Sequence, residues 1–120
     1  MSELYRPQLP GSWDLAARSR KVANDWIELT NSFPSRCQEI FDQLTSSPID
    51  SIDRSQKRLK GSLALTTFDG QEYERWQIDI NSSSRIWYFV IETSFGRNQK
   101  RRSGKVVIDR IYFGHPKSTE

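Results

Sequence analysis

Cysteine and histidine are the scarcest reactive residues of this 120-residue chain, which contains one of each, Cys37 and His115. A single cysteine forms no internal disulfide, so we expect a protein of a reducing compartment, the cytoplasm. One Cys and one His would need several carboxylates to make a metal cluster, and the sequence has no such grouping. We therefore expect neither a metal site nor a cofactor.

Long apolar runs are also missing. The longest, IWYFVI at residues 86–91, is far shorter than the roughly 20 residues that a membrane helix needs. The first residues, MSELYRPQLPG, have no basic start followed by an apolar stretch, so we expect no signal peptide. These features predict a cytoplasmic protein without membrane contact.

Aromatic residues, in contrast, make up 12% of the chain and charged residues 28%, which argues against disorder. The length suits one domain with one core, spanning residues 1–120. Residues 1–11 contain Pro7 and Pro10, and we expect them to be either flexible or an edge strand.

Positive charge is concentrated in two acid-free segments, RSQKRLK at residues 54–60 and RNQKRRSGK at residues 97–105, although the net charge is only +3. Two such segments suggest a polyanionic partner, with nucleic acid the first candidate. The alternative is a pair of solvated loops, and charge alone does not decide between them.

The first half of the chain has helical periodicity. Ser12 is a good N-cap, and the apolar spacing that follows predicts a helix that ends near Pro34. A second helix is predicted in PSRCQEIFDQLTSSP, with Ser35 and Gln38 as a capping box. The apolar faces are expected to hold Leu15, Val22, Trp26, Leu29 and Phe33 in the first helix, and Cys37, Ile40, Phe41 and Leu44 in the second.

The second half has strand patterns. SLALTTF and QEYERWQIDI flank Asp69-Gly70, a strong hairpin signal, and Trp76, Ile78 and Ile80 alternate with polar residues. RIWYFVIE is apolar on both faces, as in a central strand, and KVVIDRIYF follows as the last strand. The expected fold is α+β, with two N-terminal helices on a four-stranded, mainly antiparallel sheet. In such a meander, Phe113 at the end of the last strand falls next to Arg85.

Several segments in this order resemble the RelE/ParE superfamily of toxins from bacterial toxin–antitoxin systems: RLKGSL, ERWQIDI, RIWYFV and the terminal GHPKSTE. The resemblance runs from about Leu15 to the end of the chain. It implies a RelE-like microbial RNase fold and a metal-independent endoribonuclease that cuts messenger RNA on the ribosome. It also implies a cognate antitoxin as partner. Other members of the superfamily inhibit DNA gyrase instead.

Cleavage of RNA through its 2′-hydroxyl needs a base, cations around the phosphate and an acid for the leaving oxygen. The resemblance assigns phosphate binding to Arg85, whose guanidinium can hold two phosphate oxygens, and the general acid to His115. Lys117 follows closely and could reach phosphate. The alternatives are that Arg85 closes the NSSS turn or pairs with Asp79, and that His115 is a surface residue of the tail.

Lys60 and Arg58 lie where the chain enters the sheet, and we predict a catalytic role for Lys60 and phosphate binding for Arg58. Lys57 departs from relatives that carry a glutamate base here, and a protonated lysine accepts no proton. Glu74 and Asp79 are possible substitutes. Arg75 is predicted to contact substrate or to pair with Asp79. Arg101 and Arg102 are predicted to grip RNA backbone, or an acidic antitoxin segment.

Aromatic residues around this face have two possible roles. Trp87 shares the side of Arg85, where a base could stack on it, although a half-buried tryptophan more often packs. Tyr88, on the opposite side, is expected in the core, as are Trp26 and Trp76. Beside the endoribonuclease, two functions stay open: a gyrase-inhibiting toxin without nuclease chemistry, and a non-catalytic RNA-binding module.

Overall fold

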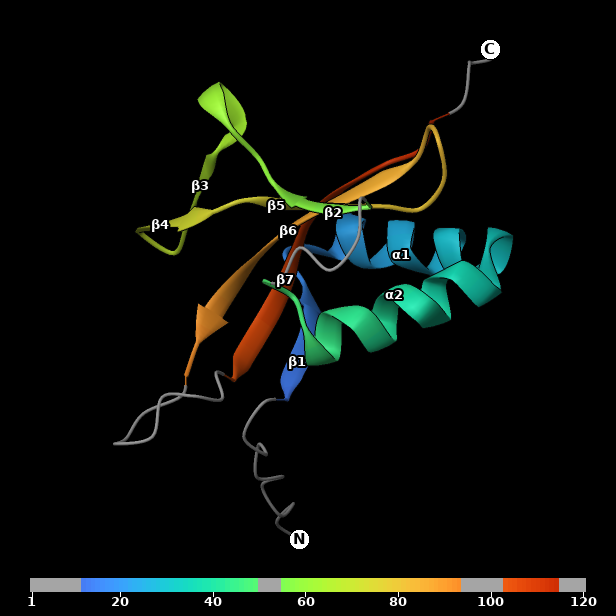
Figure 1. Cartoon of the computed structure of the whole chain (residues 1–120), viewed down its shortest axis with the longest axis horizontal. Helices are drawn as coiled ribbons and strands as arrows, with labels where there is room; N and C mark the ends of the chain where they lie inside the picture. The colour runs from blue at the N-terminus through green and yellow to red at the C-terminus, as the bar shows by residue number, and fades with distance from the viewer. Residues whose placement is uncertain (1–11, 50–54, 94–102, 115–120) are drawn as a thin grey trace, which may run out of the picture.

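The computed structural model describes residues 12–49, 55–93 and 103–114. The elements are β1 (Trp13–Ala17), α1 (Arg20–Ser32), α2 (Pro34–Ser46), β2 (Gln56–Arg58), a 3-10 turn η1 (Gly61–Leu63), β3 (Leu65–Phe68), β4 (Gln71–Glu74), β5 (Trp76–Asp79), β6 (Arg85–Glu92) and β7 (Gly104–Tyr112). Five strands form one sheet in the order β1-β7-β6-β5-β2, and β3 and β4 form a separate hairpin. The α+β class with two helices and a mostly antiparallel sheet is confirmed (Figure 1).

The predicted first helix is wrong at its beginning. Residues 13–17 form β1, which pairs in parallel with β7 from Trp13↔Gly104 to Ala17↔Ile108. Trp13, Leu15 and Ala17 alternate toward the core, as a strand requires, and Leu15 therefore belongs to a strand face and not to a helix. The helix begins at Arg20, after the N-cap Ser19, whose hydroxyl accepts a hydrogen bond from the Val22 amide.

The second helix begins at Pro34, as predicted, but without the predicted capping box. Its N-cap is Phe33, with no side-chain hydrogen bond at this position, and Gln38 donates instead to Asp42. Pro34 at the first helical position fits here because its missing N–H would have had no partner within the helix. The two helices thus follow each other directly, separated only by Phe33.

The four-stranded meander is corrected to a five-stranded mixed sheet with a hairpin beside it. The Asp69-Gly70 turn is confirmed, since both residues have positive φ (52° and 79°) and join β3 to β4. QEYERWQIDI, however, is two strands that separate at Arg75, whose amide binds the Ala64 carbonyl. β5 then pairs with β2, a strand of three residues that the sequence did not indicate.

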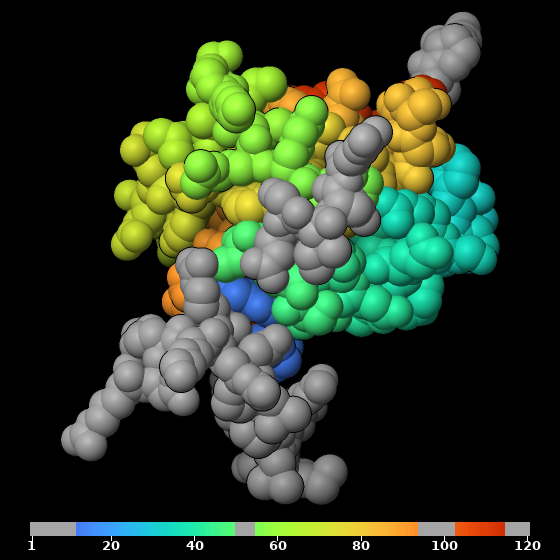
Figure 2. Space-filling view, viewed as in Figure 1, coloured from blue at the N-terminus to red at the C-terminus, as the bar shows by residue number. Residues whose placement is uncertain are grey.

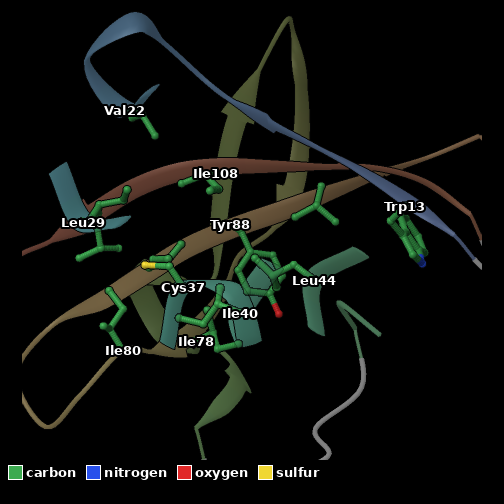
Figure 3. Close-up of a cluster of buried hydrophobic side chains, with 13 residues drawn as sticks. Trp13, Val22, Leu29, Cys37, Ile40, Leu44, Ile78, Ile80, Tyr88 and Ile108 are labelled. Atoms are coloured by element: carbon green, nitrogen blue, oxygen red, sulfur yellow. The ribbon is translucent and has the colours of Figure 1, made fainter. Parts of the chain in front are cut away.

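Both helices cover one face of the sheet, and the core lies between these layers (Figure 3). Fully buried members include Leu29, Ile40 and Tyr88, and Trp26 and Trp76 pack against them, as expected. The hydroxyl of Tyr88 donates to the Pro48 carbonyl and accepts from Gln56, so this buried polar group has partners.

The opposite face of the sheet is covered in part by the hairpin. Phe89 of β6 contacts Phe68 and Tyr73 of the hairpin, with ring centroids 5.3 and 4.9 Å apart. In Figure 2 the hairpin, yellow-green, forms one flank of the surface and the helices, cyan, form another. The rest of this face, toward Arg85, carries the polar side chains described next, and we call it the open face. It comprises Lys57, Gln77, Asp79, Arg85, Trp87, Arg110 and Tyr112.

Candidate nucleic-acid interface

Arg85 begins β6 at the open face, where its register partners are Asp79 on β5 and Tyr112 on β7. Its side chain is exposed, and its guanidinium lies over the Tyr112 ring at 5.4 Å. Within the described residues, Arg85 has no recorded ion pair. The turn before it is closed by Asn81, whose side-chain oxygen accepts from the amides of Ser83 and Ser84. Arg85 is therefore available to an external anion.

Arg110 and Tyr112 join Arg85 at this place, and neither was predicted. Arg110 is exposed and lies opposite Trp87 in the register. Its Nη1 donates to the Tyr112 hydroxyl at 3.0 Å, and this hydrogen bond raises the pKa of the Arg110 guanidinium. Tyr112 thus lies against two guanidinium groups, since Arg110 is also 5.7 Å from its ring centroid. Two exposed guanidinium groups gathered around one tyrosine on a sheet face favour phosphate.

A bulge in β7 explains why Arg110 was missed. The register passes from Trp87↔Arg110 to Tyr88↔Ile108, so Asp109 is an extra residue between them. Ile108 and Ile111 both face the core, and Arg110 faces away from it with Tyr112. The only sequence signal for this bulge was the occurrence of two consecutive charged residues, Asp109 and Arg110, within an apolar strand.

A chain of side-chain hydrogen bonds crosses the open face from β6 to β5. The Trp87 indole N–H donates to Gln77 Oε1 at 2.9 Å, and Gln77 Nε2 donates to Asp79 Oδ1 at 2.9 Å. Trp87 is buried and contacts Tyr112 edge to face. This chain fixes the carboxylate of Asp79 beside Arg85. Lys57 of β2 is exposed and lies opposite Gln77.

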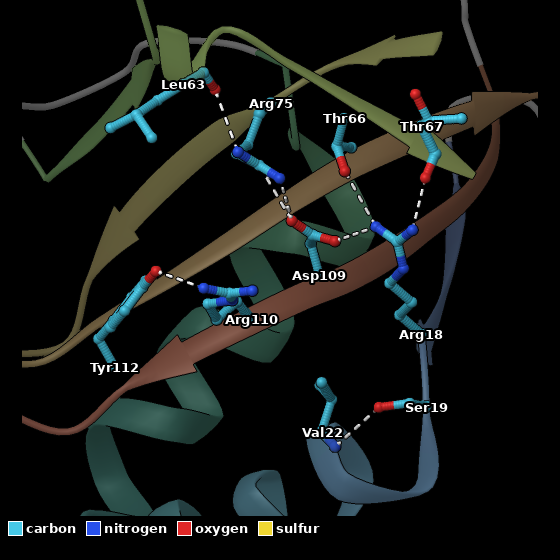
Figure 4. Close-up of polar contacts among 10 residues, drawn as sticks. All are labelled: Arg18, Ser19, Val22, Leu63, Thr66, Thr67, Arg75, Asp109, Arg110 and Tyr112. Atoms are coloured by element: carbon cyan, nitrogen blue, oxygen red, sulfur yellow. Dashed lines mark hydrogen bonds and ion pairs between the residues drawn. The ribbon is translucent and has the colours of Figure 1, made fainter. Parts of the chain in front are cut away.

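Arg75 lies in an ion pair with Asp109, at 2.9 Å, and not with Asp79 (Figure 4). The Asp109 side chain is only 4% exposed and also binds Arg18, which in turn donates to Thr66 and Thr67 of the hairpin. Arg75 is 15% exposed, and its guanidinium lies 5.0 Å from the Trp87 ring centroid. Arg75 therefore borders the open face, and its guanidinium is engaged by the carboxylate that it shares with Arg18.

Arg58 and Lys60 lie away from Arg85, toward the other end of β5. Arg58 is opposite Trp76 and forms an exposed ion pair with Glu74 at 3.2 Å. Lys60 is exposed and precedes η1. Both line a hollow of about 680 Å³. Its lining consists of Ile49, Lys57, Arg58, Lys60, Glu72, Tyr73, Glu74, Trp76, Val90 and Glu92.

The end of β7 lies beside the beginning of β6, as predicted. The Gly114 amide donates to Ser84 Oγ at 2.9 Å, one residue before Arg85. A Cβ on Gly114 would lie 1.8 Å from the Ser83 carbonyl oxygen, so this close approach requires glycine. Four of the predicted site residues lie outside the described residues: Arg101, Arg102, His115 and Lys117.

Two further features concern residues 12–49, 55–93 and 103–114. In these ranges no three His, Cys, Asp or Glu side chains gather closely enough to hold a metal ion. Neither α1 nor α2, the helices of these ranges, has the length and apolar content to cross a bilayer.

Comparison with known proteins gave no match to a protein family, to a curated protein or to a solved structure.

Proposed function

We propose that this protein is a RelE-like toxin that cleaves messenger RNA on the ribosome, without a metal ion, and that a cognate antitoxin neutralises it. The observation that carries the proposal is the pairing of Arg85 with Tyr112, which brings the end of β7 beside an exposed arginine. The segment that follows, from His115, is the one that the resemblance assigns to proton donation.

The proposed roles follow from charge and exposure. Arg85 and Arg110 hold the scissile phosphate and stabilise the charge that develops on its oxygens. His115 donates a proton to the departing 5′-oxygen. Arg58 and Lys60 lie away from Arg85, so both bind the RNA backbone at a distance from the cleaved bond, and Lys60 takes this role in place of the predicted catalytic one. Lys57, Lys117, Arg101 and Arg102 bind the RNA backbone as well.

The proposal is tested by tightly controlled expression with mapping of messenger RNA 5′ ends. Wild-type protein is expected to arrest growth and to produce new ends within translated frames. Arg85→Ala is expected to abolish these ends, and His115→Ala to weaken them. The matched control is Arg20→Ala, which removes an exposed arginine at the beginning of α1, remote from the open face.

Arrest with intact messages and damaged DNA would overturn the nuclease proposal in favour of gyrase inhibition. Normal growth together with binding of RNA would instead favour a non-catalytic RNA-binding module.

A further inference from the structure

The open face contains a carboxylate that has the geometry of a proton acceptor. We propose that Asp79 is the general base of this site and that Gln77 positions it. This inference rests on the proposed function, because it names the group that takes the proton from the attacking 2′-hydroxyl. The site needs such a group, since Lys57 carries a positive charge where a base would be expected.

The backbone of Asp79 is fixed on both sides. Its amide donates to the Ser55 carbonyl at 2.7 Å, and its carbonyl accepts from Arg36 Nη2 at 2.6 Å. Because Asp79 and Arg85 are register partners on adjacent antiparallel strands, their side chains leave the sheet on the same face. Asp79 is therefore held next to the arginine to which we assign the phosphate.

The side chain of Asp79 is oriented by a neighbour whose own orientation is determined. The indole N–H of Trp87 can only donate, so it must meet the oxygen of the Gln77 amide. The amide nitrogen of Gln77 then faces Asp79 and donates to Oδ1. One carboxylate oxygen is thus occupied by a neutral donor, which leaves Oδ2 for a substrate hydroxyl.

Two other carboxylates, those of Asp109 and Glu74, are engaged in ion pairs. Asp109 is buried between Arg18 and Arg75, and Glu74 pairs with Arg58. Among the described residues, no ion pair is recorded for Asp79, and its side chain is partly exposed. Asp79 combines a fixed orientation with access from solvent.

The proposed step balances without a further reactant. Oδ2 of Asp79 takes the proton of the 2′-hydroxyl while the 2′-oxygen forms a bond to phosphorus. The bond between phosphorus and the 5′-oxygen breaks, and the acid of the site gives its proton to that oxygen. The products are a 2′,3′-cyclic phosphate and a 5′-hydroxyl, and Arg85 offsets the charge of the pentacoordinate intermediate.

The test compares Asp79→Asn with the unaltered protein in single-turnover cleavage of messenger RNA on programmed ribosomes. Asparagine keeps the shape of the side chain and can still accept from Gln77, so ribosome binding and the urea midpoint are expected to stay unchanged. The cleavage rate is expected to fall by about 10²- to 10⁴-fold, the usual contribution of a general base. Asp14→Asn, an exposed carboxylate on β1, is the matched control and should cleave normally.

A second substrate distinguishes a base from an acid. It is a message with sulfur in place of the 5′-oxygen at the cleavage site, and its leaving group departs without a proton from an acid. Asp79→Asn is expected to stay slow on this substrate, as a variant without its base should. Recovery of the rate would show that Asp79 acts as an acid and would overturn the inference. Full activity of Asp79→Asn beside an active wild type would overturn the inference alone. Absence of cleavage by the wild type would overturn the proposed function as well.

Discussion

The guanidinium of Arg85 lies over the ring of Tyr112, 5.4 Å from its centroid, on the next strand of the sheet. A cation over an aromatic face is stabilised by about 0.5–1 kcal/mol at an exposed site. Contact with a ring face uses the charge of the guanidinium and none of its hydrogen-bond donors, so its N–H groups remain able to donate to an anion. Tyr112 therefore orients Arg85 without neutralising it, as a carboxylate partner would.

Replacement of Arg85 by lysine tests this geometry. Lys keeps the charge but has no planar fork for two phosphate oxygens, so we expect cleavage to fall strongly in Arg85→Lys and to vanish in Arg85→Ala. The free energy of unfolding should change by about 1 kcal/mol or less in both, because the side chain is exposed and its main contact is the Tyr112 ring. Single-turnover cleavage and urea unfolding measure the two effects. Full activity of Arg85→Lys would mean that charge alone suffices.

Tyr112 offers a graded test of the same cluster. Tyr112→Phe keeps the ring under Arg85 but removes the hydroxyl that accepts from Arg110. Loss of one hydrogen bond of about 0.5–1.5 kcal/mol predicts a decrease in cleavage rate of roughly 10-fold or less. Tyr112→Leu releases both arginines and should lower the rate further. Equal rates in the two variants would show that the ring does not orient Arg85.

The sequence predicted those structural features whose signals lie in neighbouring residues. The second helix and the Asp69-Gly70 turn were predictable, because Pro34 and two residues with positive φ act on their own neighbourhood. The adjacency of Arg85 and the end of β7 was also predictable, since an antiparallel meander imposes it. Strand pattern therefore predicted where Arg85 lies, whereas its assignment to phosphate came from the resemblance.

Non-local pairing accounts for what was missed. WDLAA is compatible with a helix by spacing and became a strand because β7, far along the chain, offers it a parallel partner. Gln56–Arg58 is polar and short, and only its pairing with β5 makes it a strand. Arg110 faces the site only because Asp109 bulges, a local irregularity that alternation of apolar residues does not encode.

Asp109 gives a prediction about stability. Its buried carboxylate binds both Arg18 and Arg75, which attach the hairpin and η1 through Thr66 and Leu63. Asp109→Asn leaves two arginines without their shared counter-charge, and the free energy of unfolding is expected to fall by about 3 kcal/mol. This is the lower end of the range for a broken buried ion pair, because both arginines are partly exposed.

Urea unfolding measures this cost, and Glu39→Gln is the control. Glu39 belongs to an exposed ion pair with Arg36, so its loss should cost less than about 1 kcal/mol. If the two variants were equally stable, the network around Asp109 would contribute no more than a surface pair.

The link between Gly114 and Ser84 predicts a loss of activity without loss of the fold. Ser84→Ala removes the hydroxyl that accepts from the Gly114 amide and should lower the rate of cleavage, because the chain then loses its attachment beside Arg85. Ser83→Ala is the control, since it leaves that bond intact. Gly114→Ala should be more severe, given the clash with the Ser83 carbonyl. Similar rates for Ser84→Ala and Ser83→Ala would contradict the argument.

Cys37 predicts how stability depends on pH. Burial in the core raises the pKa of its thiol, and the nearby positive charge of Arg36 opposes this only in part. Because the folded state resists forming the thiolate, the contribution of the Cys37 thiol to stability is complete below the ordinary thiol pKa of 9.0. It is lost as the pH rises through the higher pKa of the folded state.

Urea midpoints measured below and above pH 9.0 should fall more steeply for the wild type than for Cys37→Ala, which has no thiol to titrate. The variant also leaves a small cavity, so its midpoints start lower, and the comparison is of slopes. Parallel slopes would mean that the thiol ionises equally well in the folded and unfolded chains.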